Sequence, residues 1–135
     1  MKKLVLLTLF VTLIMGAVNA QSNKTNTVPA NGPKIEFSTR LHNYGQIDKG
    51  GDGNCEFTFT NTGNEPLILA NVRASCGCTT PNWTKDPIMP GQTGTIKVKY
   101  NTNNVGNFQK TITVTSNSVV DDRVVLTIKG NVTQK

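Results

Sequence analysis

The sequence predicts an all-β domain, a sandwich of two packed sheets with about seven short strands. From Pro33 onward, apolar residues recur with a period of two, as in strands that bury one face and expose the other. No window shows the period of a long amphipathic helix. Turn-forming residues, Pro90-Gly91 the clearest among them, separate the apolar runs at the short spacing typical of a sandwich.

The expected strands follow one another along most of the chain. Most of them alternate strictly, with threonine or lysine at the outward positions, where such residues suit a solvated sheet face. The run 67–72 is mostly apolar, which is typical of a strand buried on both sides. Turns are expected at 61–64, 90–91 and 101–106. We expect strands at 35–37, 55–60, 67–72, 96–100, 108–115 and 124–129.

The inward positions of these strands define the expected core. Two phenylalanines on one strand dominate it, and truncating either should cost about 3–5 kcal/mol. The core residues we expect are Ile35, Phe37, Phe57, Phe59, Leu67, Leu69, Ile96, Val98, Ile112, Val114, Leu126 and Ile128.

The N-terminal residues have the pattern of a cleavable export signal. Lys2 and Lys3 precede an apolar run of about 15 residues, 4–18, which is shorter than the roughly 20 residues of a membrane-spanning helix. Small residues at Val18 and Ala20 suit cleavage before Gln21. We therefore expect a signal peptide at 1–20, a flexible linker at 21–33 and a sandwich domain at 34–135, exported to the periplasm or the outside of the cell.

The charge pattern argues against nucleic-acid binding. The full chain has a formal net charge of +6, and removing Lys2 and Lys3 with the signal lowers it to +4. The remaining basic residues are scattered, and none forms a cluster interleaved with aromatic side chains. We therefore expect a solvated basic surface and no nucleic-acid partner.

The segment 75–79, with the sequence SCGCT, carries two of the three cysteines. Cys76 and Cys78 could bind a soft ion such as Cu(I), with Met89 as a possible third ligand, or exchange disulfides. A structural disulfide could instead join one of them to Cys55. The interpretation we favour is two small, largely buried thiols at the end of a strand, with Gly77 giving the backbone freedom for a sharp bend.

Catalysis finds little support in the rest of the chain. His42 is the only histidine available to a Ser-His-Asp or Cys-His arrangement, and it lies near the end of the first expected strand. The segment 50–53 is rich in glycine but lacks the lysine and the following helix of a phosphate-binding loop. We therefore expect no enzyme activity and no cofactor.

The motifs and their order resemble a known family. The segment 57–63 with Pro66-Leu67, then SCGCTTP at 75–81, then Pro90-Gly91 with 96–100, and finally 106–117 and 126–130 match its pattern. Together they are similar to the domain-of-unknown-function 1573 family of secreted bacterial proteins, over about residues 34–132. The resemblance implies an immunoglobulin-like sandwich, export and a wider likeness to Hydin-type and sperm-protein-type interaction modules. It implies no reaction and no role for Cys55.

The function that we expect is therefore a non-catalytic, exported binding or assembly module of the bacterial cell envelope. Its partner would be another envelope protein, bound through end loops or by strand addition at a sheet edge. The segment 75–90 is the expected contact region, with Thr79, Thr80 and Trp83 as candidate residues. Trp83 suits either an interface or a lid over the core. The alternative is a thiol-based Cu(I)-binding or redox protein that uses Cys76 and Cys78.

Overall fold

A computed structural model of the chain describes residues 31–134 and Gly16. The predicted signal peptide and residues 21–30 of the predicted linker lie outside the described residues, apart from Gly16. The described part contains strands and no helix, and it therefore has no helix that could cross a membrane. The strands are β1 (Ile35–Phe37), β2 (Leu41–Asp48), β3 (Asn54–Asn61), β4 (Leu69–Ala74), β5 (Thr79–Trp83), β6 (Thr93–Tyr100), β7 (Gly106–Ser116) and β8 (Arg123–Thr133).

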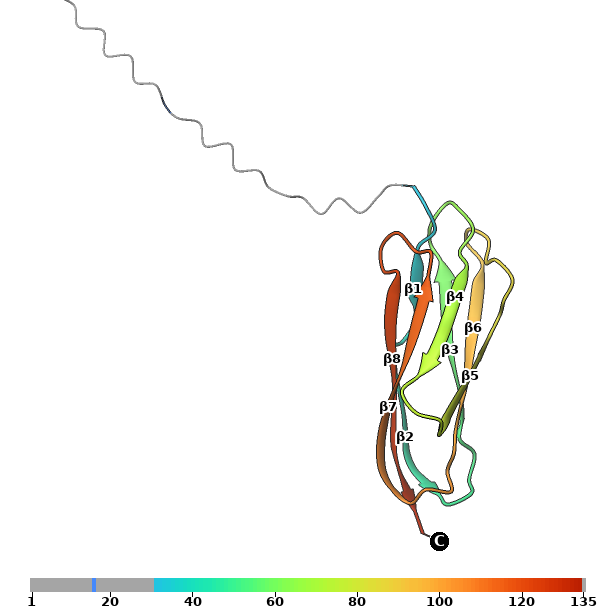
Figure 1. Ribbon diagram of the computed structural model, residues 1–135, viewed down its shortest axis with the longest axis vertical. Coiled ribbons are helices and arrows are strands. Elements are labelled where there is room, and N and C mark those ends of the chain that lie inside the picture. Colours follow the sequence, from blue (N-terminus) through green and yellow to red (C-terminus); the bar gives the residue numbers. More distant parts are fainter. Residues whose placement is uncertain (1–15, 17–30, 135) are drawn as a thin grey trace, which may run out of the picture.

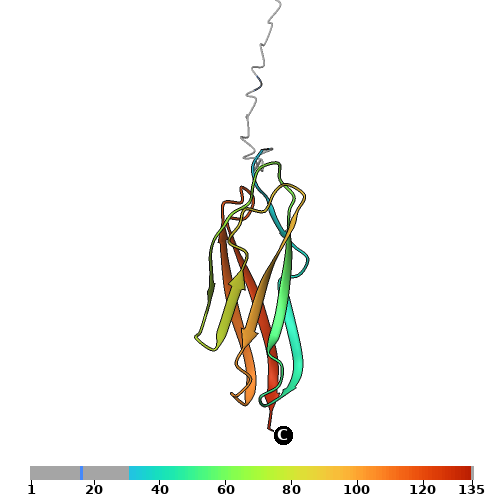
Figure 2. The ribbon, with the colours of Figure 1, turned by 90° about the vertical axis from the view of Figure 1, so that its right-hand side faces the viewer.

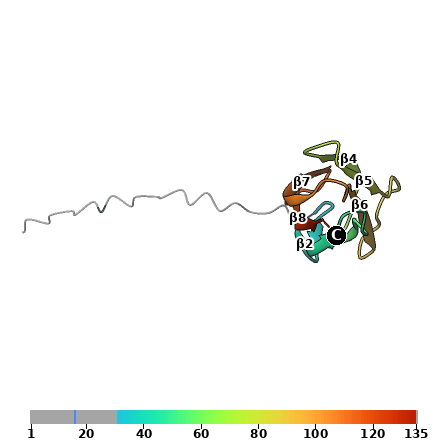
Figure 3. The same ribbon diagram turned by 90° about the horizontal axis from the view of Figure 1, so that it is seen from below.

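The strands form two four-stranded sheets that pack face to face (Figures 1 and 3). One sheet has the order β1-β3-β6-β5, and the other has the order β2-β8-β7-β4. Apart from β2, whose pairing with β8 is parallel, all neighbours are antiparallel. This is the strand arrangement of a constant-type immunoglobulin sandwich, with an extra strand beside the last one. The predicted fold class is confirmed.

The eighth strand arises because the first strand is divided between the two sheets. β1 pairs with β3, and its last backbone bond is donated by Ser38 N–H to Thr58 O, at 3.0 Å. The chain then crosses to the other sheet, where Thr127 N–H donates to Arg40 O at 2.8 Å and β2 begins. The predicted break between Phe37 and Cys55 therefore contains a strand that the sequence did not reveal.

The inner faces of both sheets supply one core. Every residue of the expected core is buried, and Phe57, Leu67, Ile96, Ile112, Leu126 and Ile128 are fully so. The core is larger than expected, because β4, β6, β7, β8 and the loop before β6 each add buried residues to it. The additional buried apolar residues are Val72, Ile88, Tyr100, Phe108, Val124 and Val132.

The packed domain begins before the expected boundary at residue 34. Gly32 and Pro33 are buried. Gly32 N–H donates to Asn64 Oδ1 at 2.8 Å, and Val119 N–H donates to Pro33 O at 2.9 Å. Residues 31–33 therefore form part of the folded domain and not of a flexible linker. They lie at the opposite end of the elongated sandwich from the C-terminus (Figures 1 and 2).

Candidate functional site

The segment 75–78, here called the cysteine turn, joins β4 to β5 and so carries the chain from one sheet to the other. β4 and β5 are the last strands of their sheets and lie on the same side of the sandwich. The expected loop over 75–90 is thus only partly a loop, because 79–83 forms a strand against β6. The sequence did not predict this strand because it contains Pro81, and proline within a sheet is confined mainly to edge strands and bulges.

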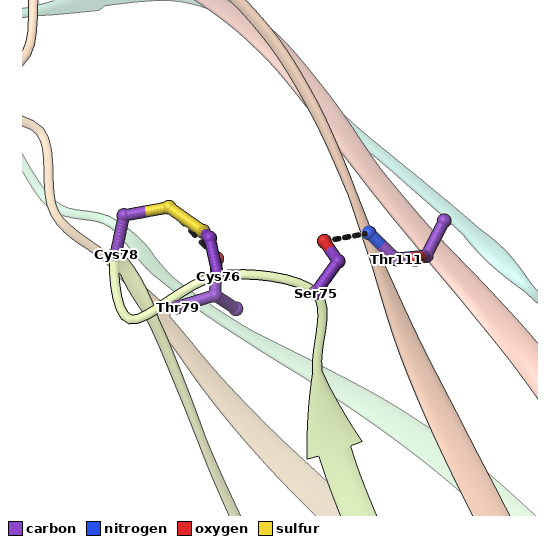
Figure 4. Close-up of a disulfide and its surroundings, with 5 residues drawn as sticks. All are labelled: Ser75, Cys76, Cys78, Thr79 and Thr111. Carbon is purple, nitrogen blue, oxygen red and sulfur yellow. Dashed lines mark hydrogen bonds between the residues drawn. A yellow bond between two sulfur atoms is a disulfide. The ribbon is translucent and has the colours of Figure 1, made fainter.

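A disulfide joins Cys76 to Cys78, with 5.3 Å between their Cα atoms (Figure 4). Both residues are half-buried, and Cys55 is a free cysteine. The favoured interpretation of two buried free thiols is therefore wrong. Since Cys55 lies opposite Val98, whose other neighbour is Pro81, strand spacings put Cys55 and Cys78 roughly 14 Å apart between Cα atoms. A disulfide requires less than about 7 Å.

Both sheets hold the cysteine turn in place. Ser75 N–H donates to Thr111 O at 2.9 Å, and Thr111 N–H donates back to Ser75 Oγ at 3.1 Å (Figure 4). On the other sheet, Asn101 N–H donates to Cys78 O at 2.8 Å. Thr79 lies beneath, only 4% exposed, with its Oγ1 at 3.7 and 3.8 Å from the two sulfurs. The turn is therefore a fixed link between the two sheet edges.

Gly77 does not have the role that we expected. Its φ is not in the left-handed region, unlike that of Gly91, and a Cβ atom added to it would meet no atom within 4 Å. A larger residue would fit there without backbone strain. The bend between the cysteines therefore does not depend on the conformational freedom of glycine.

A shallow polar depression of about 620 Å³ lies beside the cysteine turn. Cys78, Thr80 and Lys99 line one side, and the turn at 50–54 lines the other. Asp52 in that turn accepts hydrogen bonds from the backbone and side-chain amides of Asn54, which lower the pKa of its carboxyl group. The depression therefore offers polar groups of both charges next to the disulfide.

The structure does not bring Met89 to the cysteines. Met89 precedes β6 and Cys78 lies beyond its other end, so the length of that strand, roughly 25 Å, separates them. Among residues 31–134, no three His, Cys, Asp or Glu side chains lie close enough to hold a metal ion. A Cu(I) ion at this turn would therefore have only the two sulfurs of Cys76 and Cys78, in their reduced form, as protein ligands of this kind.

The hydrogen-bond pattern decides which backbone groups face the open side of these strands. Because Ser75 bonds to β7, the alternation of an antiparallel ladder turns the N–H groups of Val72 and Ala74 away from β7. Cys78 bonds to the residue after β6, so Thr79, Pro81 and Trp83 point away from β6 in the same manner. Pro81 has no N–H to offer, so β4 presents the better edge for an added strand.

Trp83 closes β5 and is half-buried against the core. This location agrees with the expectation of a lid over the core. The Nζ atom of Lys85 lies 3.0 Å from the centre of its ring, a cation–π contact. Its indole N–H is buried and has no acceptor among the described residues. Of the three candidate contact residues, Thr80 is exposed, Trp83 is half-buried and Thr79 is buried.

Cys55 and His42 lie apart from the cysteine turn. Burial raises the pKa of the Cys55 thiol, and the hydroxyl of Tyr44 partly offsets this. Tyr44 donates to Gly53 O at 2.8 Å, and burial raises its own pKa. His42 is half-buried on β2, edge-on to Tyr44 with 4.5 Å between ring centres. This neighbourhood is an aromatic extension of the core.

Comparisons with known proteins agree with this architecture. A family model described as "Protein of unknown function (DUF1573)" matches residues 35–132. No curated protein sequence matches the chain.

Solved structures with the same fold include the following three. A protein of unknown function from Porphyromonas gingivalis W83 has a TM-score of 0.66 at 17% identity, over 76% of this chain and 48% of that one. The PapD-like domain 7 of human CEP192 has a TM-score of 0.65 at 7% identity, over 79% and 89%. The CsuC–CsuE chaperone–tip adhesion subunit pre-assembly complex of Acinetobacter baumannii has a TM-score of 0.54 at 11% identity, over 73% and 56%. The chain thus spans about half the length of the Porphyromonas gingivalis and Acinetobacter baumannii chains.

Proposed function

Since the chain belongs to the DUF1573 family of proteins of unknown function, whose model matches nearly all of the described domain, we propose that it is a non-catalytic binding or assembly module exported to the bacterial envelope. A PapD-like sandwich supports this proposal, because one of its structural neighbours is a complex between a chaperone and the pilus subunit it assembles. The partner that we propose is another envelope protein, bound as an added strand.

The open edge of β4 is the surface that carries this proposal. Val72 and Ala74 direct their N–H and C=O groups away from β7, so an extended segment of the partner could continue the sheet there. The inner face of such a strand would lie toward β5, where Trp83 would contact it, whereas Thr80 points to the outer face of its own sheet. Thr79 would support this contact indirectly, by holding the disulfide in position.

Site-specific photo-crosslinking in the native host would test this edge. A photoreactive residue at Arg73, exposed on β4, should capture a partner, whereas one at Val125, exposed on β8 two strands away in the same sheet, should not. Ala74→Pro removes one outward N–H and no bond to β7, so it should abolish capture, whereas Ala74→Val should retain it. Equal capture by both variants would contradict strand addition.

Export has its own test, which does not depend on the partner. Mass spectrometry of the protein from fractionated cells should find Gln21 as the N-terminus, in the periplasmic or the extracellular fraction. Recovery of the uncleaved chain from the cytoplasm would refute the proposal of an envelope protein.

A second candidate function rests on the half-buried disulfide beside the polar depression. A dithiol reductant would break the S–S bond, become a disulfide itself and leave two thiols on Cys76 and Cys78, which could then bind Cu(I). Counting thiols before and after dithiothreitol treatment, followed by Cu(I) titration, tests this function. One equivalent of Cu(I) bound only after reduction, and lost in a Cys76→Ser, Cys78→Ser double variant, would favour it. No uptake by the reduced protein would exclude Cu(I) binding.

A further inference from the structure

A cluster of amide side chains lies on the outer face of the β2-β8-β7-β4 sheet, in the half where β2 and β8 end and β7 begins. Two rows of three residues cross adjacent strands β2, β8 and β7. The registers place Asn43 beside Lys129 and Lys129 beside Gln109, and in the next row Gln46 beside Asn131 and Asn131 beside Asn107. We call these six residues the amide grid. Neighbours in a row are about 4.8 Å apart, and the rows are about 7 Å apart.

The amide grid has no evident structural purpose. Asparagine is depleted in strands, yet three asparagines occupy this small area of sheet. Among the described residues, the side chains of Gln46, Asn107, Gln109 and Asn131 have no hydrogen-bond partner, and only Asn43 uses its oxygen, to cap Gly45 N–H at 2.9 Å. Residues that are unfavourable for their strand and gain no compensating hydrogen bond often mark functional positions.

The grid rests on a rigid support. Phe108 packs beneath it against Gly130, where a Cβ atom would come within 3.0 Å of the ring. Tyr100 stacks on the other side of Phe108, with 3.8 Å between ring centres. A shallow depression of about 600 Å³ lies over the grid and reaches Gly45 and Phe108. The strands beneath the grid are therefore well packed, and only the amide side chains would have to be ordered on binding.

From this arrangement, we propose that the amide grid binds a neutral oligosaccharide. Each amide offers two donors and one acceptor oxygen, and sugar hydroxyls both donate and accept. The grid contains a single charge, on Lys129, which makes it a weak site for an anion. This site lies on a sheet face, separate from the open edge of β4, so it does not depend on the protein partner proposed above.

Titration of the isotopically labelled mature chain with cellopentaose and with chitopentaose tests the proposal by NMR. We expect amide shifts confined to the grid strands for at least one of these sugars, at millimolar concentrations. An Asn107→Ala, Asn131→Ala double variant should weaken binding at least tenfold, since each lost hydrogen bond is worth about 1 kcal/mol. A Thr113→Ala, Thr115→Ala variant, near the end of β7 and away from the grid, is the matched control and should bind as the parent does.

Two outcomes would overturn the proposal. One is the absence of localised shifts with both neutral sugars while the variants remain folded. The other is binding of dextran sulfate that is lost in Lys129→Gln and in moderate salt, together with no response to the neutral sugars, because the surface would then act through its charge.

Discussion

Replacing Asn61 by leucine should remove a large part of the stability of this domain. Asn61 is 0% exposed at the end of β3, and its side chain makes four hydrogen bonds. Its Oδ1 accepts from Lys34 N–H at 3.2 Å and Gly63 N–H at 3.0 Å. Its Nδ2 donates to Glu65 O at 2.7 Å and Ile88 O at 2.9 Å. One amide thus ties the chain entry and two loops to the end of a strand.

The expected loss follows from these bonds. Leucine has the same branching as asparagine, so Asn61→Leu removes the hydrogen bonds and leaves no cavity, while its bulkier methyl groups push the four partners outward. Four bonds at about 1 kcal/mol each predict a loss of about 4 kcal/mol, because their backbone partners stay partly buried without a replacement. A domain of this size has a total stability of about 5–15 kcal/mol, and such a loss lowers Tm by about 15–30 °C.

Urea unfolding followed by tryptophan fluorescence and circular dichroism would measure this loss. Asn64→Leu is the matched control, since Asn64 is exposed and, among the described residues, its side-chain amide bonds only to Gly32 and Asn31. It should cost about 1–2 kcal/mol. In Asn61→Asp, a carboxylate oxygen would face the carbonyls of Glu65 and Ile88, which raises the folded-state pKa of the new carboxyl group. That variant should therefore gain stability as the pH falls below this raised pKa. An Asn61→Leu variant no less stable than Asn64→Leu would refute the reasoning.

Three further predictions concern the cysteines and glycines. The Cys76→Ser, Cys78→Ser double variant should lose only about 1–2 kcal/mol in urea unfolding, because the disulfide closes a very short loop; failure to fold would show a larger role. Gly77→Ala should change the free energy of unfolding by less than about 0.5 kcal/mol. Gly53→Ala should be strongly destabilised because its Cβ would collide with the backbone oxygen of Tyr100. Equal stabilities of the Gly77→Ala and Gly53→Ala variants would contradict this geometry. Burial raises the pKa of Cys55, so stability present below the unfolded thiol pKa of about 9 should fall as the pH rises above it. Cys55→Ala should make the free energy of unfolding less dependent on pH in this range. An unchanged dependence would indicate that the thiol is exposed and would contradict the prediction.

The core was predictable because its physical signal is local. Phe57 and Phe59 alternate with polar residues, and this alternation alone fixes which face is buried. β2 lacks that signal, since its side chains are only half-buried or exposed and Gly45 interrupts its register. β5 carries Pro81, which argues against a strand unless its edge position is known. Asn61 was assigned to a turn, because only the folded chain brings the carbonyl of Ile88 to its amide.

The candidate site was less predictable for the same reason. The motif 75–79 could be located as a bend between strands, but its consequences depend on contacts far away in sequence. Thr111 and Asn101 hold the turn from different sheets, and nothing in the sequence links either of them to the cysteines. The pairing of Cys76 with Cys78 rather than Cys55 follows from strand register. The amide grid consists of residues spread over residues 43–131, and only the pairing of three strands unites them.

The parallel pairing of β2 with β8 has a mechanical consequence. The segment that leads into β1 and the C-terminal end lie at opposite poles of the sandwich (Figure 1), so tension between them pulls these two strands past each other along their length. Their backbone hydrogen bonds would then be loaded together in shear rather than opened one at a time like a zipper. We therefore expect the domain to resist stretching between its two ends. Single-molecule pulling from these ends would measure the unfolding force.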